Sequence, residues 1–280
     1  MLERVRLRRR LRALSRELAA RHPPPQQAWE GDYGDRHGKL LDWAHASDEL
    51  DRLLEAGGQL PGGYGAGLDE RVVEFPWLYA RRPFGRLLDA GSTLNHEHIL
   101  DRFQPEAGWL CIATLRPEQA SYTQRGISYV YCDLRELPFR DGFFDTVICA
   151  STLEHVGMDN RRYGDEAPSA GDPDTEQRAA LEELMRVVAP GGRVLVTVPY
   201  GRAEDHGWFR QYDESSLRRL LDGLDASITV YGYGAGGWQL SSLAAARDAQ
   251  YKDHSTDKTP APDRAAAARA VACIRLRTAS

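Results

Sequence analysis

The 280-residue sequence lacks long apolar runs, and it pairs none of its cysteines closely. No run of about 18 apolar residues occurs, so no helix is expected to span a membrane. Arginines between Arg4 and Arg16 interrupt the first apolar stretch, so no signal peptide is expected. No CxxC pair is present, which argues against a structural zinc site. We therefore expect no metal site. The four cysteines are expected to be buried free thiols in a reducing cytoplasm, and they are Cys111, Cys132, Cys149 and Cys273.

Lysine is nearly absent, because only three of the 36 basic residues are lysine. The formal net charge is −5, and residues 1–22 contribute +6 through eight arginines and two glutamates. The rest of the chain therefore has a formal net charge of −11, which is −5 minus +6. An acidic body argues against a general nucleic-acid binder, since neutralising phosphates requires a basic face.

The sequence divides into three predicted parts. Residues 1–25 contain a basic amphipathic helix over 2–21, which ends before Pro23. This helix fits a surface anchor, or an element packed on the body, on a second copy of the chain or on a partner enzyme. Residues 26–84 are predicted to form a helical cap with a glycine-rich lid segment at 60–71, and residues 85–280 the main domain.

From residue 85 onward, short apolar runs alternate with helical stretches. This alternation predicts a doubly wound α/β fold with a mostly parallel seven-stranded sheet and an antiparallel edge strand. A helix is predicted over 175–188 with Asp174 as its N-cap. The predicted strands are 85–90, 109–114, 127–132, 144–150, 192–199, 227–233 and 269–277.

The loops that follow these strands are where an open α/β sheet binds its ligand. The first loop begins at Asp89 and contains Gly91 alone, so the GxGxxG pattern of a nicotinamide dinucleotide enzyme is absent. The third strand ends at Asp133, which fits an acceptor for an exocyclic amine and also fits a cap or turn. The fourth strand leads to His155, a candidate general base.

Three motifs resemble those of class I S-adenosylmethionine (SAM)-dependent methyltransferases. They are LLDAGS (87–92), CDLRELPFRDGFFDTVICASTLEHVG (132–157) and LMRVVAPGGRVLVTVPYG (184–201). The chain looks similar to the methyltransferase-11-like branch and to bacterial glycan-associated methyltransferases. The resemblance implies a Rossmann-like sheet and SAM as cofactor. The resemblance and the positions of the strand tips together indicate which residues bind the cofactor. The candidates are Asp89, Ala90, Gly91, Ser92, Asn95, Thr114, Leu115, Asp133, Leu134, Ala150 and Ser151.

The sequence departs from the family pattern at two places. The first loop has one glycine where the family has two or three. The second strand ends in Thr114-Leu115-Arg116, without the acid that holds the ribose in the family. That role is therefore expected of Thr114, of Glu118 or of a residue in 60–71.

The predicted reaction is O-methylation of a sugar, a glycan or another small-molecule hydroxyl. His155 or His206 would act as the base, with Asp205 beside them. Trp208 and Phe209 fit an aromatic platform for a sugar, and equally fit core aromatics beside a solvated loop. The alternative function is a methyltransferase-fold scaffold that binds SAM weakly and supports a partner enzyme.

Overall fold

The structure is a computed structural model that describes residues 31–82, 84–163, 171–252 and 267–278. The chain forms two compact units, one of residues up to 81 together with 229–271, and one of 82–228 together with 272–280. The predicted basic helix over 2–21 lies outside the described residues. No helix in the described part of the chain is long and apolar enough to cross a membrane.

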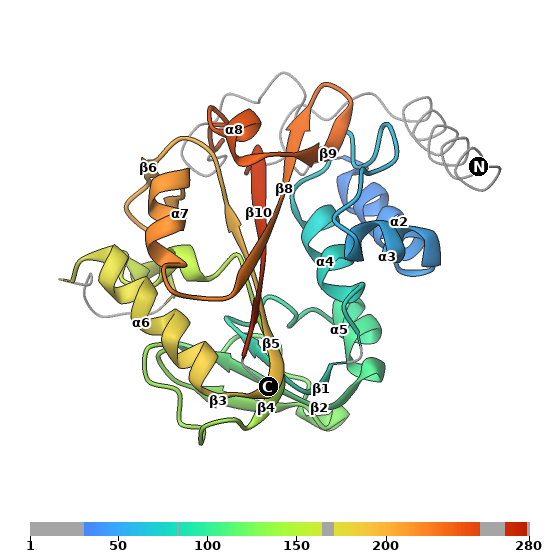
Figure 1. The fold of residues 1–280 in the computed structure, drawn as a ribbon. Helices are drawn as coiled ribbons and strands as arrows, with labels where there is room; N and C mark the ends of the chain where they lie inside the picture. The colour runs from blue at the N-terminus through green and yellow to red at the C-terminus, as the bar shows by residue number, and fades with distance from the viewer. Residues whose placement is uncertain (1–30, 83, 164–170, 253–266, 279–280) are drawn as a thin grey trace. The chain divides into compact units, whose positions relative to one another are not determined.

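The second unit is built on five parallel strands in the order β3-β2-β1-β4-β5 (Figure 1). Their central strands are almost fully buried, as expected for a parallel sheet with helices on both faces. The predicted mostly parallel sheet is confirmed. The bounds are β1 Gly85–Ala90, β2 Ala107–Thr114, β3 Ser128–Tyr131, β4 Phe144–Ala150 and β5 Val188–Pro199.

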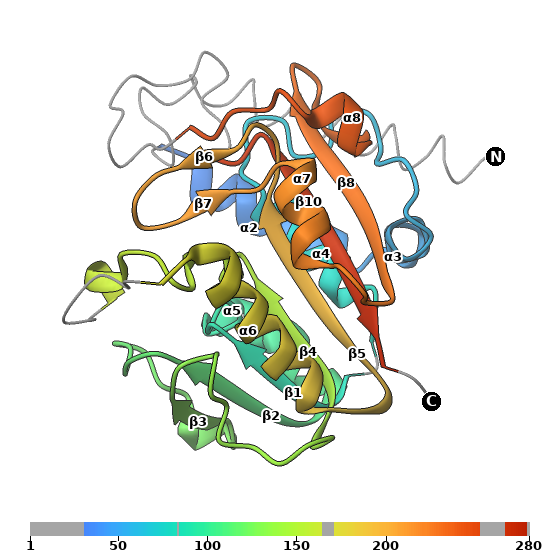
Figure 2. The same ribbon diagram turned by 60° about the vertical axis from the view of Figure 1, so that its left-hand side comes forward.

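Strand β10 (Ala270–Arg277) follows β5 in the sheet and β8 (Ala226–Gly234) follows β10. β10 runs antiparallel to β8, because the amide of Arg277 bonds the carbonyl of Asp225 and the amide of Tyr233 bonds that of Arg269. Figure 2 shows this opposed direction in the arrows. The predicted antiparallel strand is thus present, although the hairpin partner of β8, strand β9 (Gly237–Ser241), was not predicted.

Helices α5 (Glu97–Phe103) and α6 (Pro173–Arg186) lie on opposite sides of the parallel strands (Figure 1). The N-cap of α6 is Asp172, whose carboxylate accepts from the amide of Thr175 at 3.1 Å. The prediction of Asp174 as the cap was wrong. Asp174 instead pairs with arginines, so its carboxylate serves tertiary contacts that the local pattern does not reveal.

Short elements complete the second unit. They connect the strands and helices, and Leu153 on one of them and Leu217 and Leu220 on another are buried in the core. They are the 3₁₀ turns η1 (Gln104–Glu106), η2 (Thr123–Arg125), η3 (Leu153–His155) and η4 (Asn160–Tyr163), the hairpin strands β6 (Glu204–Asp205) and β7 (Arg210–Gln211), and helix α7 (Glu214–Leu220).

The first unit contains three helices with apolar faces, α2 (Tyr33–His45), α3 (Asp48–Glu55) and α4 (Arg71–Tyr79), and the short helix α8 (Leu243–Ala246). Ser47 caps α3 through the amide of Leu50. The glycine-rich segment 60–71 forms turns up to the start of α4, as predicted. Gly65 requires its positive φ of 61°, and a Cβ there would lie 2.7 Å from Val72.

Candidate functional site

The loop after β1 makes a tight turn that its own side chains fix. Asp89 is buried, and its carboxylate accepts from the amide of Leu94 at 2.8 Å. Gly91 has a φ of 114°, and its amide donates to the carbonyl of Ala113 on β2 at 2.8 Å. Ser92 has a positive φ of 60°, which is uncommon for a residue other than glycine. Asp89 therefore holds the shape of this loop.

The loops after β1 and β4 contact each other directly. The hydroxyl of Thr93 donates to the carbonyl of Ala150 at 2.6 Å, and that of Thr152 donates to the same carbonyl at 3.0 Å. A Cβ on Gly91 would lie 2.1 Å from the hydroxyl oxygen of Thr152. Ser151 also has a positive φ, of 43°. The structure thus brings the predicted residues Gly91, Ala150 and Ser151 to one place.

The loop after β2 brings a carboxylate to the same edge of the sheet. Glu118 accepts hydrogen bonds from the hydroxyl of Ser92 and, at 2.8 Å, from the side-chain amide of Asn95. Asn95 is buried, and its side-chain oxygen accepts from the hydroxyl of Tyr129 at 2.8 Å. Thr114, at the tip of β2, is half-buried. The strand tip has no acid, and the carboxylate of Glu118, four residues after Thr114, lies next to the β1 loop.

Asp133, after β3, is half-exposed and negatively charged at neutral pH. Burial alone would raise the pKa of its carboxyl, but hydrogen bonds from the backbone and side chain of Arg135, at 2.8 and 2.9 Å, lower the pKa below its usual value. Arg135 also pairs with Glu176. The turn contact to the Arg135 amide shows that Asp133 has a structural role as well as two acceptor oxygens. Leu134 beside it is buried.

Burial keeps three of the cysteines as protonated thiols. Burial raises the pKa of Cys111 to about 12 and that of Cys132 to about 11, and it raises the pKa of Cys149 further. All four are free, and Cys111, Cys149 and Cys273 are buried as predicted, whereas Cys132 is only half-buried because it lies at the exposed end of β3. Within the described ranges, no three His, Cys, Asp or Glu side chains lie close enough together to hold a metal ion.

Five aromatic side chains gather beyond the tip of β4, and we call them the aromatic wall: His155, Tyr163, His206, Trp208 and Phe209. His155 stacks on Trp208 with ring centroids 5.0 Å apart, and Tyr163 meets its edge at 5.5 Å. His206 stacks on Phe209 at 4.4 Å. Tyr163 is 46% exposed, so the wall reaches the surface.

The polar contacts of the wall distinguish its two histidines. The Nδ1 atom of His155 bonds the backbone carbonyl of Trp208 at 2.9 Å, while the Nε2 atom of His206 lies 3.1 Å from the carboxylate of Glu204. Asp205 accepts from the amide of Gly207 at 2.8 Å, which is a contact of the hairpin turn. The sequence placed both histidines near the acceptor side, and the structure gives each a different partner.

Sequence reasoning did not single out several residues that shape this region. Tyr129 and Thr152 bond the β1 loop and its neighbour, and Gln177 and Arg210 join helix α6 to the hairpin. Each lies within a regular element or an ordinary turn, so no local pattern marks it.

The comparison with protein families gives one match. Residues 110–196 match the family model described as a methyltransferase domain. This range contains β3 and β4, most of β2 and β5, and the segments that carry Glu118, Asp133 and His155.

Curated relatives match only a part of the chain. One is the tRNA (carboxymethyluridine(34)-5-O)-methyltransferase of Arabidopsis thaliana, 35% identical over 83 residues, or 30% of this chain and 17% of that protein. Another is the ubiquinone/menaquinone biosynthesis C-methyltransferase UbiE of Yersinia pestis, 31% identical over 121 residues, or 40% of this chain and 41% of that protein. The chain spans less than half the length of either relative.

Among solved structures, the chain is similar to the N-methyltransferase NodS of Bradyrhizobium japonicum in complex with S-adenosyl-L-homocysteine (SAH). The TM-score is 0.46 at 15% identity, with 87% of this chain and 99% of that chain covered. The family match agrees with the sheet order and motifs described above. Residues 110–196 are therefore similar to a methyltransferase domain, in agreement with the resemblance that the sequence motifs carry.

Proposed function

We propose that this chain is a SAM-dependent methyltransferase that methylates a hydroxyl group of a sugar, a glycan or another small molecule. One observation carries the proposal. The adjacent tips of β1, β2 and β4 bring Glu118, Gly91 and Ser151 together, and the loop after β4 leads into the aromatic wall. The proposed donor site and the proposed acceptor surface would thus follow one another along the carboxyl edge of the sheet.

The residues at these tips fit the groups of SAM. The charged Asp133 offers acceptor oxygens for the adenine amine, with the apolar Leu134 beside it. Glu118 offers a carboxylate for the ribose hydroxyls. The backbone of Gly91 and of Ala150 and Ser151 would line the methionine part. When bound, SAM supplies an electrophilic methyl group on a sulfonium.

His155 is the residue that we assign as the base. The carbonyl of Trp208 can only accept a hydrogen bond, so Nδ1 of neutral His155 carries the proton. Nε2 is then the ring nitrogen with the lone pair. It would take the proton of the acceptor hydroxyl, which would make that oxygen the nucleophile for the methyl group that SAM would supply. His206, beside Glu204, would orient the acceptor.

The stacked rings support a sugar or another flat-faced acceptor. Trp208 and Tyr163 present aromatic faces and edges at the surface end of the wall, and His206 and Glu204 place hydrogen-bonding groups beside them. Such a combination binds the apolar face and the hydroxyl rim of a sugar ring.

The free thiols fit a reducing compartment, so we place the enzyme in the cytoplasm. We assign a homodimer contact or a partner enzyme to the basic segment 2–21.

The test separates binding from transfer. Calorimetry with SAH should show binding, and its absence would favour the scaffold alternative. Transfer from labelled SAM is then measured on a panel of sugars, glycans and small-molecule alcohols, with tRNA included because one relative is a tRNA methyltransferase. H155A should lower turnover about 100-fold with SAH binding retained, as expected for a lost general base. H98A is the matched control, because His98 is exposed on α5.

A further inference from the structure

We propose that Gln177 is a positioning residue, which sets the His155 segment against the β6–β7 hairpin and thereby fixes the tautomer of His155. The proposal rests on the proposed function, because it assigns His155 to the acceptor site. Its subject is a buried amide on helix α6 that joins the two segments from which the aromatic wall is built.

The nitrogen of the Gln177 side chain bonds the segment after β4. Gln177 is fully buried, and its Nε2 atom donates to the backbone carbonyls of Glu154 at 3.3 Å and Val156 at 3.1 Å. These two residues flank His155 in the chain. The backbone on both sides of His155 is therefore attached to one side chain of α6.

The oxygen of the same amide bonds the hairpin. Oε1 accepts from Nε of Arg210 at 2.7 Å and from the hydroxyl of Tyr212. Burial raises the pKa of Tyr212, so its hydroxyl stays protonated and acts as the donor. Both protons and both lone pairs of the Gln177 amide are thus used, which leaves this buried group fully satisfied.

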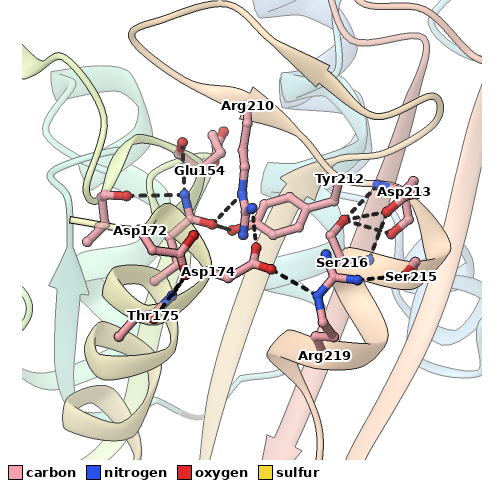
Figure 3. A network of polar contacts seen from close by, with 12 residues as sticks. Glu154, Asp172, Asp174, Thr175, Arg210, Tyr212, Asp213, Ser215, Ser216 and Arg219 are labelled. Carbon is pink, nitrogen blue, oxygen red and sulfur yellow. Dashed lines mark hydrogen bonds and ion pairs between the residues drawn. The ribbon is translucent and has the colours of Figure 1, made fainter. Parts of the chain in front are cut away.

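Arg210 is itself held in one orientation. The Asp174 carboxylate accepts from Arg210 and, at 2.9 Å, from Nε of Arg219, and the Arg210 guanidinium lies 4.7 Å from the centre of the Tyr212 ring (Figure 3). Burial opposes ionisation of Asp174, but the two arginines lower its pKa, so the carboxylate is charged. The guanidinium of Arg210 is therefore held in the orientation in which its Nε atom donates to Gln177.

These contacts of Gln177 hold the Trp208 carbonyl near Nδ1 of His155, and the tautomer of His155 depends on that distance. The bond from Nδ1 of His155 to the Trp208 carbonyl crosses from the η3 segment to the hairpin. A second bond between these segments joins the Asp159 amide to the Gly207 carbonyl at 3.0 Å. Gln177 bonds both the segment around His155 and the β6–β7 hairpin. Without these bonds, fewer contacts keep the Trp208 carbonyl close to Nδ1 of His155.

Two variants divide the Gln177 contacts. Q177E keeps an acceptor for Arg210 and Tyr212 but places an oxygen against the carbonyls beside His155. R210M keeps the bonds to those carbonyls and removes the main contact with the hairpin. Nitrogen NMR of the histidine rings reports the tautomer of His155 without any acceptor. Q104M is the matched control, because Gln104 is also bonded both ways to an arginine, on η1 and η2.

We expect the wild type to hold His155 as the Nδ1–H tautomer, and Q177E and R210M each to shift it measurably toward the Nε2–H form. With an acceptor identified, kcat should fall 10- to 100-fold while the Kd for SAH stays within twofold. Q104M should change neither quantity. If a variant fails to fold, Y212F removes a single bond to Gln177 and should move the tautomer in the same direction.

An unchanged tautomer in Q177E, R210M and Y212F would overturn the proposal, as would an equal loss of SAH affinity and kcat. A wild type that binds no SAH would instead refute the proposed function. The NMR comparison would still decide the role of Gln177, so the two failures are distinguishable.

Discussion

Replacing Gly91 by alanine tests whether the contact between the β1 and β4 loops fixes the donor side of the site. The structure predicts two separate costs. A φ of 114° is strained for any residue with a Cβ, which costs about 1–3 kcal/mol. The new Cβ would also lie 2.1 and 2.2 Å from the Oγ1 and Cγ2 atoms of Thr152, an overpacking that costs about 1–3 kcal/mol.

We therefore expect G91A to lower the free energy of unfolding by about 2–6 kcal/mol, a large part of the usual stability of a domain. Urea unfolding followed by circular dichroism measures this loss. G126A is the matched control, because Gly126 has a positive φ of 80° and a Cβ there would meet no atom of the described residues within 4 Å. It should show the backbone cost alone, about 1–2 kcal/mol.

The double variant G91A/T152A relieves most of the contact, since alanine at 152 removes the two nearest atoms, Oγ1 and Cγ2, and leaves the Cβ of residue 152 at 2.6 Å. The double-mutant cycle should give a coupling of about 1–3 kcal/mol. SAH affinity of G91A should fall as well, and recover in part in the double variant. A coupling below about 0.5 kcal/mol, within the additivity of independent sites, would refute the assignment of this glycine to close loop packing.

Three further outcomes are expected. D133A should weaken SAH binding about 10- to 100-fold by calorimetry, because a charged acceptor is lost, and an unchanged Kd would remove Asp133 from the adenine site. E118A should weaken SAH binding about tenfold or more, whereas E136A, beyond the β3 tip, should not. Burial and the nearby Asp69 raise the pKa of Glu70 to about 8, so wild-type stability should fall between pH 4.5 and 8. In E70Q, the free energy of unfolding from urea titrations should fall less steeply with pH, by up to about 1.4 kcal/mol per pH unit. Equal pH dependence in E70Q and the wild type would contradict the raised pKa of Glu70.

The order of elements along the parallel sheet could be predicted from the sequence, because it depends on local apolar patterning. The runs at 85–90 and 144–150 became strands β1 and β4 with the predicted bounds. Strand β9 was missed, since its Gly237–Ser241 segment carries no apolar run and acquires its structure by pairing with β8. The hairpin of β6 and β7 was missed for the same reason.

The candidate site divides in a similar way. Gly91, Asp133 and His155 were identifiable because each follows a recognisable strand, and strand tips meet at one edge of the sheet. The role of Glu118 in bonding Ser92 and Asn95 depends on how two loops meet, which no spacing in the chain records.

The sequence by itself thus determined the fold class and the charge separation and predicted the edge of the sheet at which a ligand would bind, because these follow from periodicity, composition and the geometry of parallel strands. Only the tertiary structure decided which nitrogen of His155 carries the proton and which side chains hold the aromatic wall. Gln177 bonds residues more than 20 positions before it and more than 30 after it, and contacts over such separations exist only once the chain has folded.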